Sequence, residues 1–470
     1  MPHFRAPCES PLTQYEANRR PRSVQMFKLK KGLDLPVLGS PSTSDIQAPD
    51  IRTVAVLGAD YIGLKPRLQV EEGEKIGAGA PIFFHKDTPE VMVTAPASGR
   101  VRAINRGARR VLISVEIDVD PKAAKPVNFS KVGNAETREG LIEKLCASGL
   151  WTSFRTRPYS KVPESTATTD AIFVTAMDTE PLCADPALII AGATEEFETG
   201  LAAITKLTEG TVYVCRKAGT AVPGDGMSGV EMAEFDGPHP AGLAGTHIHF
   251  LHPVTAENAV WTIGYQDVIA IGHLLKTGLN DAERVIALSG PRAANPRLMR
   301  VPAGASLLDI TENEASGDAP LRLISGSILS GRMGAGTDAY LGRYARQVTM
   351  IEEDKAQIPM GWVRPMFSKY AVQPVLGSAM SKRLYALTSN LNGGRRAMVP
   401  IGTFETLMPQ DFLPTQLLRS LLVMDTDTAQ QLGALELDEE DLGLVGFACP
   451  AKYEYGIALR DCLSKIEKEG

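Results

Sequence analysis

The sequence predicts a protein of several domains that combines the α/β and α+β classes. The chain has 470 residues, and at roughly 100–200 residues per domain this length predicts about three domains. Short β-branched runs separated by glycine turns dominate the N-terminal part, whereas strand-like and helix-like patterns alternate through the middle. Near the C-terminus, leucines recur at the period of a helix. These three observations predict different architectures for successive parts of the chain.

The composition is typical of globular domains and excludes several classes of protein. Hydrophobic residues make up 44% of the chain, and 49 Lys and Arg against 55 Asp and Glu give a net charge of −6. This balance excludes global disorder and argues against a nucleic-acid-binding protein. No stretch approaches the ~20 apolar residues that span a bilayer, so any action at a membrane would come from one side.

The cysteines form no C-x-x-C pair and no C-x2-C-x2-C run, which argues against a disulfide scaffold and an iron–sulfur site. A reducing compartment is therefore expected. The cysteines are Cys8, Cys146, Cys183, Cys215, Cys449 and Cys462.

Residues 1–25 are a separate segment. They contain four prolines and four arginines, with no apolar periodicity and no apolar signal region. We expect a disordered or non-native N-terminal extension, not a secretory signal. A different pattern begins at Met26, which we expect to be the natural start of the protein.

Residues 26–125 are predicted to be all-β. Their β-branched runs alternate with glycine turns and lie at Thr53–Leu57, Val91–Thr94 and Val111–Ile117.

One hairpin in this region resembles the barrel-sandwich hairpin of biotinyl and lipoyl carrier domains. The resemblance rests on Val70–Ile82 followed by Thr94–Val101. Carrier domains attach their cofactor to a lysine at the hairpin tip, where this chain has Thr88, and the nearby Lys86 lacks the flanking methionines. The resemblance therefore implies the lipoyl-like fold without the attachment chemistry.

Residues 126–290 alternate strand and helix, which predicts a Rossmann-like parallel α/β domain. No G-x-G-x-x-G follows any of its strands, which counts against a bound dinucleotide. The expected elements are a helix at 141–146 ending at Gly149, a strand at Ala171–Ala176, a helix at Thr199–Leu207, a strand at Thr211–Cys215, and a helix at Asp267–Lys276 followed by Gly278.

Two further regions complete the chain. Residues 291–365 contain short β-branched runs and resemble the β-grasp module known as SLBB. Residues 366–470 are expected to be helical, because leucines recur every three to four residues over Asp411–Val423. The acidic cluster Glu436–Asp441 is expected to be a solvated helix start, where negative charge is favourable.

A histidine cluster is the strongest candidate for chemistry. If the segment is a strand, His247 and His249 share one face, as two metal ligands would, and His239 and Asp236 are further candidate ligands. The alternation of histidine with apolar residues also fits a half-buried strand with hydrogen-bonded imidazoles. We favour this second interpretation because no Cys or Glu motif accompanies the pair.

Other motifs are weaker. The glycine-rich run Gly331–Gly336 contains Arg332 and could cradle an anion, but a flexible turn is the favoured interpretation. No nucleophile elbow, Walker loop or H-E-x-x-H is present.

Several long motifs together resemble the A subunit of the sodium-translocating NADH:quinone oxidoreductases (Na⁺-NQR). The resemblance runs from Met26 to the C-terminus, and only residues 1–25 fall outside it. The matching motifs are Met26–Pro36, Thr94–Val101, Ala103–Ala108, Gly245–Phe250, Ser325–Gly331, Cys449–Gly456 and Ile466–Gly470.

This resemblance implies a component of a six-subunit translocase that oxidises NADH, reduces ubiquinone and exports sodium ions. The A subunit is expected at the cytoplasmic face of the bacterial inner membrane, without a membrane span. It would contact the five other subunits (B to F), chiefly the membrane-embedded B subunit, and lie near ubiquinone. NADH oxidation, the flavins, the iron–sulfur cluster and the Na⁺ path are expected in other subunits.

The isolated chain is accordingly expected to be inactive and to contribute to quinone access and assembly. We assign it no catalytic, cofactor-binding or metal residue. The alternative is a soluble metal-dependent or carrier-type enzyme that uses His247 and His249.

A more distant resemblance links Leu141–Pro181 to the flavin domain of the complex I NADH-binding subunit. There a glycine-rich loop admits FMN, but here Ser148–Pro158 keeps one glycine and adds the bulk of Trp151 and Phe154. Asp178–Pro181 matches an acidic-proline element of those sites. We therefore expect a flavin-domain frame without bound FMN.

Overall fold

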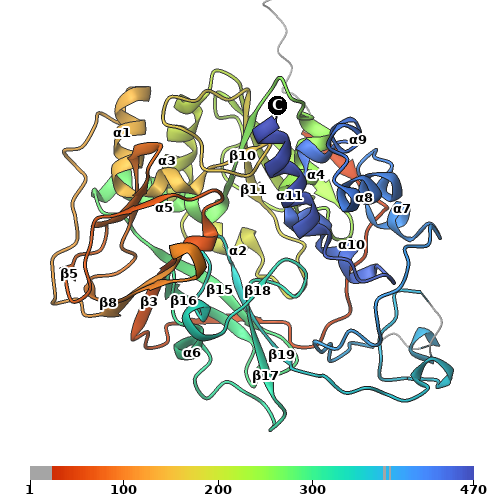
Figure 1. Ribbon diagram of the computed structural model, residues 1–470. Coiled ribbons are helices and arrows are strands. Elements are labelled where there is room, and N and C mark those ends of the chain that lie inside the picture. The colour runs from red at the N-terminus through yellow and green to blue at the C-terminus, as the bar shows by residue number, and fades with distance from the viewer. Residues whose placement is uncertain (1–23, 374–376, 381–382, 470) are drawn as a thin grey trace, which may run out of the picture.

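The computed structural model describes residues 24–373, 377–380 and 383–469. Figure 1 shows a central α/β layer with the small sheets of the N-terminal part (orange) on one side and the C-terminal helices (blue) on the other. A second six-stranded sheet lies beneath this layer in the view. Within the described residues, no helix is long and apolar enough to cross a membrane. The predicted N-terminal extension, residues 1–25, lies almost wholly outside the described residues.

The central sheet has the strand order β1-β13-β12-β11-β14-β10, parallel except for β10. All six residues of β11 are buried, because helices cover both faces of the sheet and both sides of each strand need apolar residues. The strands are β1 (Gln25–Lys28), β10 (Arg155–Arg157), β11 (Ala171–Ala176), β12 (Thr211–Lys217), β13 (Val230–Asp236) and β14 (Val260–Gly264).

Four helices pack on one face of this sheet, and α4 packs on the other. Gly149 and Gly278 end α1 and α5 in the left-handed conformation, with φ of 81° and 77°, as predicted. The helices are α1 (Arg138–Ser148), α2 (Pro186–Ala191), α3 (Thr194–Ile204), α4 (Ala244–Leu251) and α5 (Tyr265–Thr277). The expected helix at Thr199–Leu207 thus starts five residues earlier.

The N-terminal β region contains two small sheets around one apolar core. The first has the order β3-β9-β8-β5 and the second β4-β6-β7. The strands are β3 (Thr53–Leu57), β4 (Pro66–Leu68), β5 (Lys75–Ile76), β6 (Pro81–His85), β7 (Thr88–Thr94), β8 (Gly99–Arg106) and β9 (Leu112–Val119). The predicted runs in this region all form strands.

The tip of the hairpin between β6 and β7 differs from the expectation. His85 pairs with Thr88, so Lys86 and Asp87 form the turn. Thr88, which the spacing placed at the tip, is already the first residue of β7.

Residues 26–47 do not join the small β-sheets, although the sequence grouped them with residues 26–125. β1 pairs with β13 of the central sheet, and β2 (Ser42–Gln47) pairs with β16 of the second six-stranded sheet. Phe27 explains the first pairing, because its ring stacks on that of Phe235 at 4.9 Å. A sequence pattern cannot reveal this, since an edge strand carries no mark of its partner.

The second six-stranded sheet has the order β18-β17-β19-β15-β16-β2. Its strands besides β2 are β15 (Glu283–Ser289), β16 (Arg297–Pro302), β17 (Leu321–Ser325), β18 (Arg332–Met333) and β19 (Gln347–Glu352), with the short helix α6 at Leu307–Ile310. β15 belongs to this sheet, whereas the sequence pattern placed its residues in the preceding 126–290 region.

The C-terminal helices begin later than expected. Residues 383–402 contain no helix, because Gly393, Gly394 and Pro400 interrupt a stretch without apolar periodicity. Pro414 begins the predicted leucine-rich helix, and Leu413 is outside it with 58% exposure. The helices are α7 (Thr403–Leu407), α8 (Pro414–Val423), α9 (Thr426–Gln431), α10 (Gly443–Ala448) and α11 (Tyr455–Glu469).

Short 3-10 turns connect these elements. They lie at Gly58–Asp60, Ala108–Arg110, Leu150–Ser153, Thr205–Leu207, Gly336–Asp338, Gly361–Val363, Gly377–Met380, Ala434–Glu436 and Glu439–Leu442.

Candidate functional site

The order of strands in the central sheet creates a crevice at its carboxyl edge. From β11 the chain continues through β12 and β13 on one side, and then crosses by α4 to β14 on the other side. Ligands of α/β sheets bind outside the carboxyl ends of the strands at such a reversal. A cavity of about 60 Å³ lies there, between Thr175 at the end of β11 and Gly264 at the end of β14. We name it the edge cavity.

Charged side chains dominate the lining of the edge cavity. Two carboxylates, those of Asp267 and Glu440, face it from α5 and from the C-terminal region. Four arginines line it, so positive charge exceeds negative charge by two among the lining residues. These are Arg155 in β10, Arg284 in β15, and Arg343 and Arg346 before β19.

Asp267 holds two of the arginines together. Its Oδ1 accepts from Arg284 Nη2 at 2.6 Å and lies 2.8 Å from Arg343 Nη2, and Ser153 Oγ donates to it at 3.1 Å. Burial alone would raise the pKa of Asp267, but Arg343 and Arg284 outweigh it and hold the pKa below its ordinary value. The carboxylate is therefore charged at neutral pH.

Tyr344 forms an aromatic wall of the same cavity. The guanidinium of Arg155 lies 4.8 Å from the centre of its ring, a cation–π contact, and the Tyr344 hydroxyl donates to the carbonyl of Thr152 at 2.8 Å. Burial raises the pKa of Tyr344 to about 12, so the ring stays neutral.

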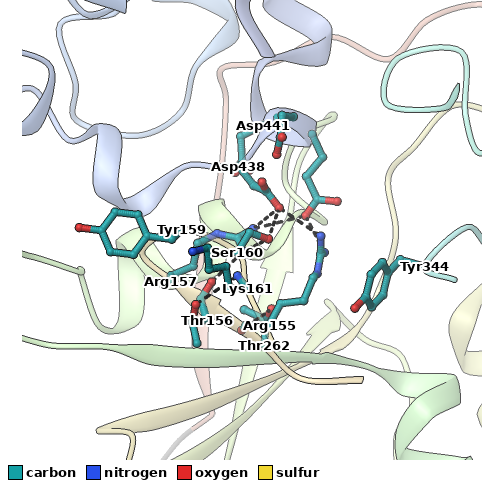
Figure 2. Close-up of polar contacts among 12 residues, drawn as sticks. Arg155, Thr156, Arg157, Tyr159, Ser160, Lys161, Thr262, Tyr344, Asp438 and Asp441 are labelled. Atoms are coloured by element: carbon teal, nitrogen blue, oxygen red, sulfur yellow. Dashed lines mark hydrogen bonds and ion pairs between the residues drawn. The ribbon is translucent and has the colours of Figure 1, made fainter. Parts of the chain in front are cut away.

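Beside the cavity, Asp438 joins β10 to the C-terminal region, and Figure 2 shows arginines converging on its carboxylate. Arg155 Nη1 lies 3.1 Å and Arg157 Nη2 lies 3.3 Å from Oδ2, while Arg460 Nη2 lies 2.7 Å from Oδ1. Ser160 Oγ donates to Oδ2 at 2.7 Å. Burial opposes the charge, but the arginines, Arg157 first, hold the pKa of Asp438 well below its ordinary value.

The acidic cluster Glu436–Asp441 is therefore not the solvated helix start that the sequence suggested. Asp438 does begin a helical turn, and its backbone N–H donates to Asp441 Oδ2 at 2.8 Å, but both side chains are buried. The arginines of β10 require buried counter-charges, and this cluster supplies them. Burial, with Glu440 and Asp438 nearby, raises the pKa of Asp441 to about 8.

The histidine pair is on helix α4, not on a strand, so His247 and His249 point in different directions. His247 is fully buried, with Nε2 3.0 Å from the carbonyl of Ala241, and burial lowers its pKa to about 3. His249 Nε2 accepts from the N–H of Asp411 at 3.0 Å, so Nδ1 donates to Glu436 at 2.8 Å. Each imidazole has its own partners.

The other two candidate metal ligands do not join them. His239 is buried with Nδ1 3.2 Å from Thr179 Oγ1, and Asp236 ends β13. The parts of the chain that the structure describes hold no group of three or more His, Cys, Asp or Glu residues arranged for a metal. The described residues therefore contain no set of metal ligands for the alternative function based on His247 and His249.

The loop after α1 is filled with aromatic side chains. Trp151 and Phe154 are fully buried, and Trp151 meets the ring of Trp261 edge-on at 5.4 Å and donates from Nε1 to the carbonyl of Pro163. These two bulky side chains occupy the loop that the distant flavin-domain resemblance aligns with a cofactor-binding loop.

The acidic-proline element and the glycine-rich run are both engaged in contacts inside the protein. Glu180 accepts from Ser327 Oγ at 2.5 Å, and burial raises its pKa to about 7. Asp178 lies 3.6 Å from Arg346. Arg332 of the glycine-rich run is in β18 and donates to Asp60 at 3.0 Å, so its guanidinium binds another part of this chain.

Three family models match successive parts of the chain. They are described as the NqrA N-terminal barrel-sandwich hybrid domain, over residues 27–120, the NqrA second alpha/beta domain, over 136–280, and the NQRA C-terminal domain, over 285–334. The first two confirm the predicted barrel-sandwich and α/β domains.

Curated relatives extend this similarity along almost the whole chain. The A subunit of the Na(+)-translocating NADH-quinone reductase of Pasteurella multocida is 50% identical over 449 residues, which cover 95% of this chain and all of the relative. The proteins of the same name from Neisseria gonorrhoeae and Rhodopirellula baltica are 49% and 48% identical, over 95% and 94% of this chain and 100% and 98% of theirs. The chain belongs to the NqrA family, the A subunits of the Na(+)-translocating NADH-quinone reductases. The resemblance found in the sequence motifs is confirmed.

Two solved structures show a distant likeness to this member of the NqrA family. Two crystal structures of an NAD⁺-reducing [NiFe]-hydrogenase, air-oxidized and H₂-reduced, match at a TM-score of 0.34. Their identities are 12% and 11% over 46% and 48% of this chain and 47% and 49% of theirs. A likeness at this level indicates nothing about function.

A groove lies largely in the part of this NqrA-family chain that follows the three family models, and Arg322 and residues 328–331 of the third model also line it. It opens between residues 370–373 and 388–403 on one side and helices α10 and α11 on the other, with a volume of about 830 Å³. Its apolar and aromatic lining includes Tyr370 and Phe447, whose rings stack at 6.4 Å, together with Leu391 and Ile457. We name it the C-terminal groove.

The segment 355–402, part of which borders this groove, has an unusual composition. It contains seven Lys or Arg and no Asp or Glu, in a chain whose net charge is −6. Nine of the twenty large hydrophobic side chains exposed among the described residues also belong to it. These nine are Ile358, Met360, Val363, Phe367, Met380, Leu384, Leu391, Val399 and Ile401. Exposed apolar side chains concentrated in this way are typical of an interaction surface.

The arginines of the edge cavity did not stand out in the sequence. Arg155 and Arg346 are far apart along the chain, so no short motif connects them. Two local signals were present: Asp267 comes three residues after the buried strand β14, and Arg343 and Arg346 are three residues apart. Only the fold brings these side chains together.

Proposed function

We propose that this chain is the A subunit of a sodium-translocating NADH-quinone reductase, a multisubunit oxidoreductase that couples electron transfer to sodium transport. The observation that carries the proposal is identity near 50% along the entire length of relatives with that name. A match that covers 100% of the relative includes all of its domains. The location that goes with this role is the cytoplasmic face of the bacterial inner membrane.

Within the complex, the chain would dock through the 355–402 segment. When a partner covers exposed apolar side chains, the free energy of the system falls. The surrounding arginines and lysines favour an acidic or membrane-adjacent partner. Of the five partner subunits (B to F), the membrane-embedded B subunit fits this description best. Arg395 and Arg396, both exposed, lie among these apolar residues.

Quinone access is the second part of the proposal. A quinone ring and its apolar tail require a concave site with aromatic and aliphatic walls and a few polar groups. The C-terminal groove has such a lining, and it borders the proposed docking segment. A quinone that leaves the membrane-embedded partner could thus reach Tyr370 and Phe447 without crossing bulk water.

The electron-transfer steps are assigned to the partner subunits. We propose that this chain binds no FMN and does not oxidise NADH alone, while the flavins, the iron–sulfur cluster and the Na⁺ path belong to the rest of the complex. The burial of Trp151 and Phe154 in the loop after α1 supports this, because a flavin needs close backbone approach there.

Affinity purification from gently solubilised membranes tests the proposal. The tagged chain should co-purify with five other subunits, and the flavin absorbance should belong to those partners. Recovery of the chain alone, from the soluble fraction and without flavin-containing partners, would contradict the proposed function.

A further inference from the structure

The edge cavity contains hydrogen-bond donors that nothing in the described chain satisfies. Nη1 of Arg343 and Nη1 of Arg346 are both buried, and neither has a hydrogen-bond partner among the described residues. Both side chains line the cavity. Buried donors are nearly always paired, so two such guanidinium groups beside one cavity suggest a partner that belongs there.

Two helices also begin at this cavity. The residue before α4, Leu243, and the residue before α5, Gly264, both line it. Neither helix has a side-chain cap, so its first-turn N–H groups and the positive end of its dipole are directed to this edge of the sheet. The carboxyl group of Asp441 lies against Gly245 in the first turn of α4.

The charges around the cavity favour an anion. Its lining holds four arginines against Asp267 and Glu440, an excess of two positive charges. Two carboxylates that do not line the cavity contact these arginines: Asp178 lies 3.6 Å from Arg346, and Asp438 lies 3.1 Å from Arg155. These outer carboxylates stabilise the arginines without using the two unpaired Nη1 atoms.

The size of the cavity selects a compact ligand. Its volume is about 60 Å³. By the same measure one water requires roughly 10–15 Å³, so a group of four to six heavy atoms fits. A tetrahedral phosphate has five heavy atoms, whereas a ring system would require the walls formed by Tyr344 and Arg343 to move.

The geometry points to an anion site: the edge cavity binds a compact dianion of the phosphate class through Arg343 and Arg346 and the N-terminal amides of α4 and α5. Arginine suits this role because its planar fork binds phosphate oxygens in pairs. Uncapped helix starts supply further N–H donors to the same oxygens. The site goes beyond the proposed function, because it requires neither quinone nor the partner subunits.

Calorimetric titration of the purified full chain with inorganic phosphate tests this site. Chloride at matched ionic strength is the reference. We expect saturable binding of one phosphate per chain, weakened about tenfold or more in Arg346→Gln, because a charge-assisted hydrogen bond is lost. The matched control is Arg300→Gln, at an exposed residue of β16 outside the cavity, which should bind phosphate as the unchanged chain does.

Two further arms complete the test. Arg346→Lys keeps the positive charge but lacks the planar guanidinium that can bind two oxygens at once. This variant should bind phosphate more weakly than the unchanged chain and should keep its melting temperature in the absence of phosphate. Adenosine monophosphate distinguishes the source: binding as tight as that of phosphate supports a phosphate carried on a larger ligand, and weaker binding supports the free ion. Absence of saturable binding, or equal binding by Arg346→Gln and Arg300→Gln, would overturn the site.

Discussion

At the scale of single residues, Asp438 is the main electrostatic contact between the α/β domain and the C-terminal helices. Its carboxylate is 3% exposed and contacts the guanidinium groups of Arg155, Arg157 and Arg460. Arg157 has no exposed surface at all. Removing one member of a buried ion-pair network leaves the others without compensation, which costs more than the pair contributes.

Asp438→Asn should therefore destabilise the protein strongly. We expect the free energy of unfolding to fall by about 3–5 kcal/mol, the usual cost of leaving a buried charge unpaired. Urea denaturation followed by circular dichroism measures it. Asp461→Asn, an exposed exchange on α11, should change the midpoint little. Equal midpoints for the two variants would mean that the network contributes nothing to stability.

Asp441 makes stability depend on pH in a predictable direction. Its pKa is raised to about 8, so between the ordinary value of 3.8 and about 8 the folded chain holds a proton that the unfolded chain has lost. Stability is then fully present below the unfolded pKa and falls as pH rises toward the folded pKa, by at most about 1.4 kcal/mol per unit.

Asp441→Asn removes this dependence, because an amide does not titrate. Relative to the unchanged chain, the variant should gain stability steadily between pH 5 and pH 8. Denaturant midpoints of both proteins at several pH values give the difference, in which other titrating groups cancel. A difference that stays constant across this range would show that Asp441 is ionised in the folded state.

At the scale of elements, the end of α1 is fixed by one glycine. Gly149 has a φ of 81°, and a Cβ there would lie 2.6 Å from Thr94 Oγ1 of β7. The same hydroxyl donates to the carbonyl of Ser148 at 3.0 Å. The helix end and the barrel-sandwich domain therefore meet at a point with no room for a side chain.

Gly149→Ala should lower the stability of the fold by more than the strain of a left-handed backbone alone. Gly219→Ala is the matched control, since Gly219 has a φ of 77° and no atom within 4 Å of a new Cβ. We expect about 1 kcal/mol for the control from backbone strain. The Gly149 variant should lose clearly more in thermal denaturation, and equal losses would rule out the steric contact with Thr94.

Several strands and helix ends could be predicted from the sequence, and the predictions that were wrong have physical causes. The strand β11 and the glycines ending α1 and α5 follow from short-range rules of burial and backbone conformation. His247 and His249 were misassigned to a strand, because a spacing of two suggests alternation, whereas the segment is helical. The edge cavity was missed because its arginines come together only through the reversal of strand order.

At the scale of the whole molecule, the 355–402 segment is the surface on which assembly should depend. Arg395→Glu with Arg396→Glu should reduce co-purification of the partner subunits several-fold, because the reversal places acidic groups among the exposed apolar side chains. Arg109→Glu with Arg110→Glu, an exposed adjacent pair on the barrel-sandwich domain, is the control. Quantitative mass spectrometry of affinity-purified material measures partner recovery. Partner yields that fall equally for both pairs would exclude a specific docking role.

The central claim is that this chain serves the complex without performing the electron transfer itself. The direct measurement is sodium-stimulated quinone reduction by NADH in membranes that lack this chain, before and after the purified protein is added back. We predict that the purified chain alone has no activity, that depleted membranes have lost it, and that addition restores it. NADH oxidation by the purified chain alone, or full activity in depleted membranes, would contradict this claim.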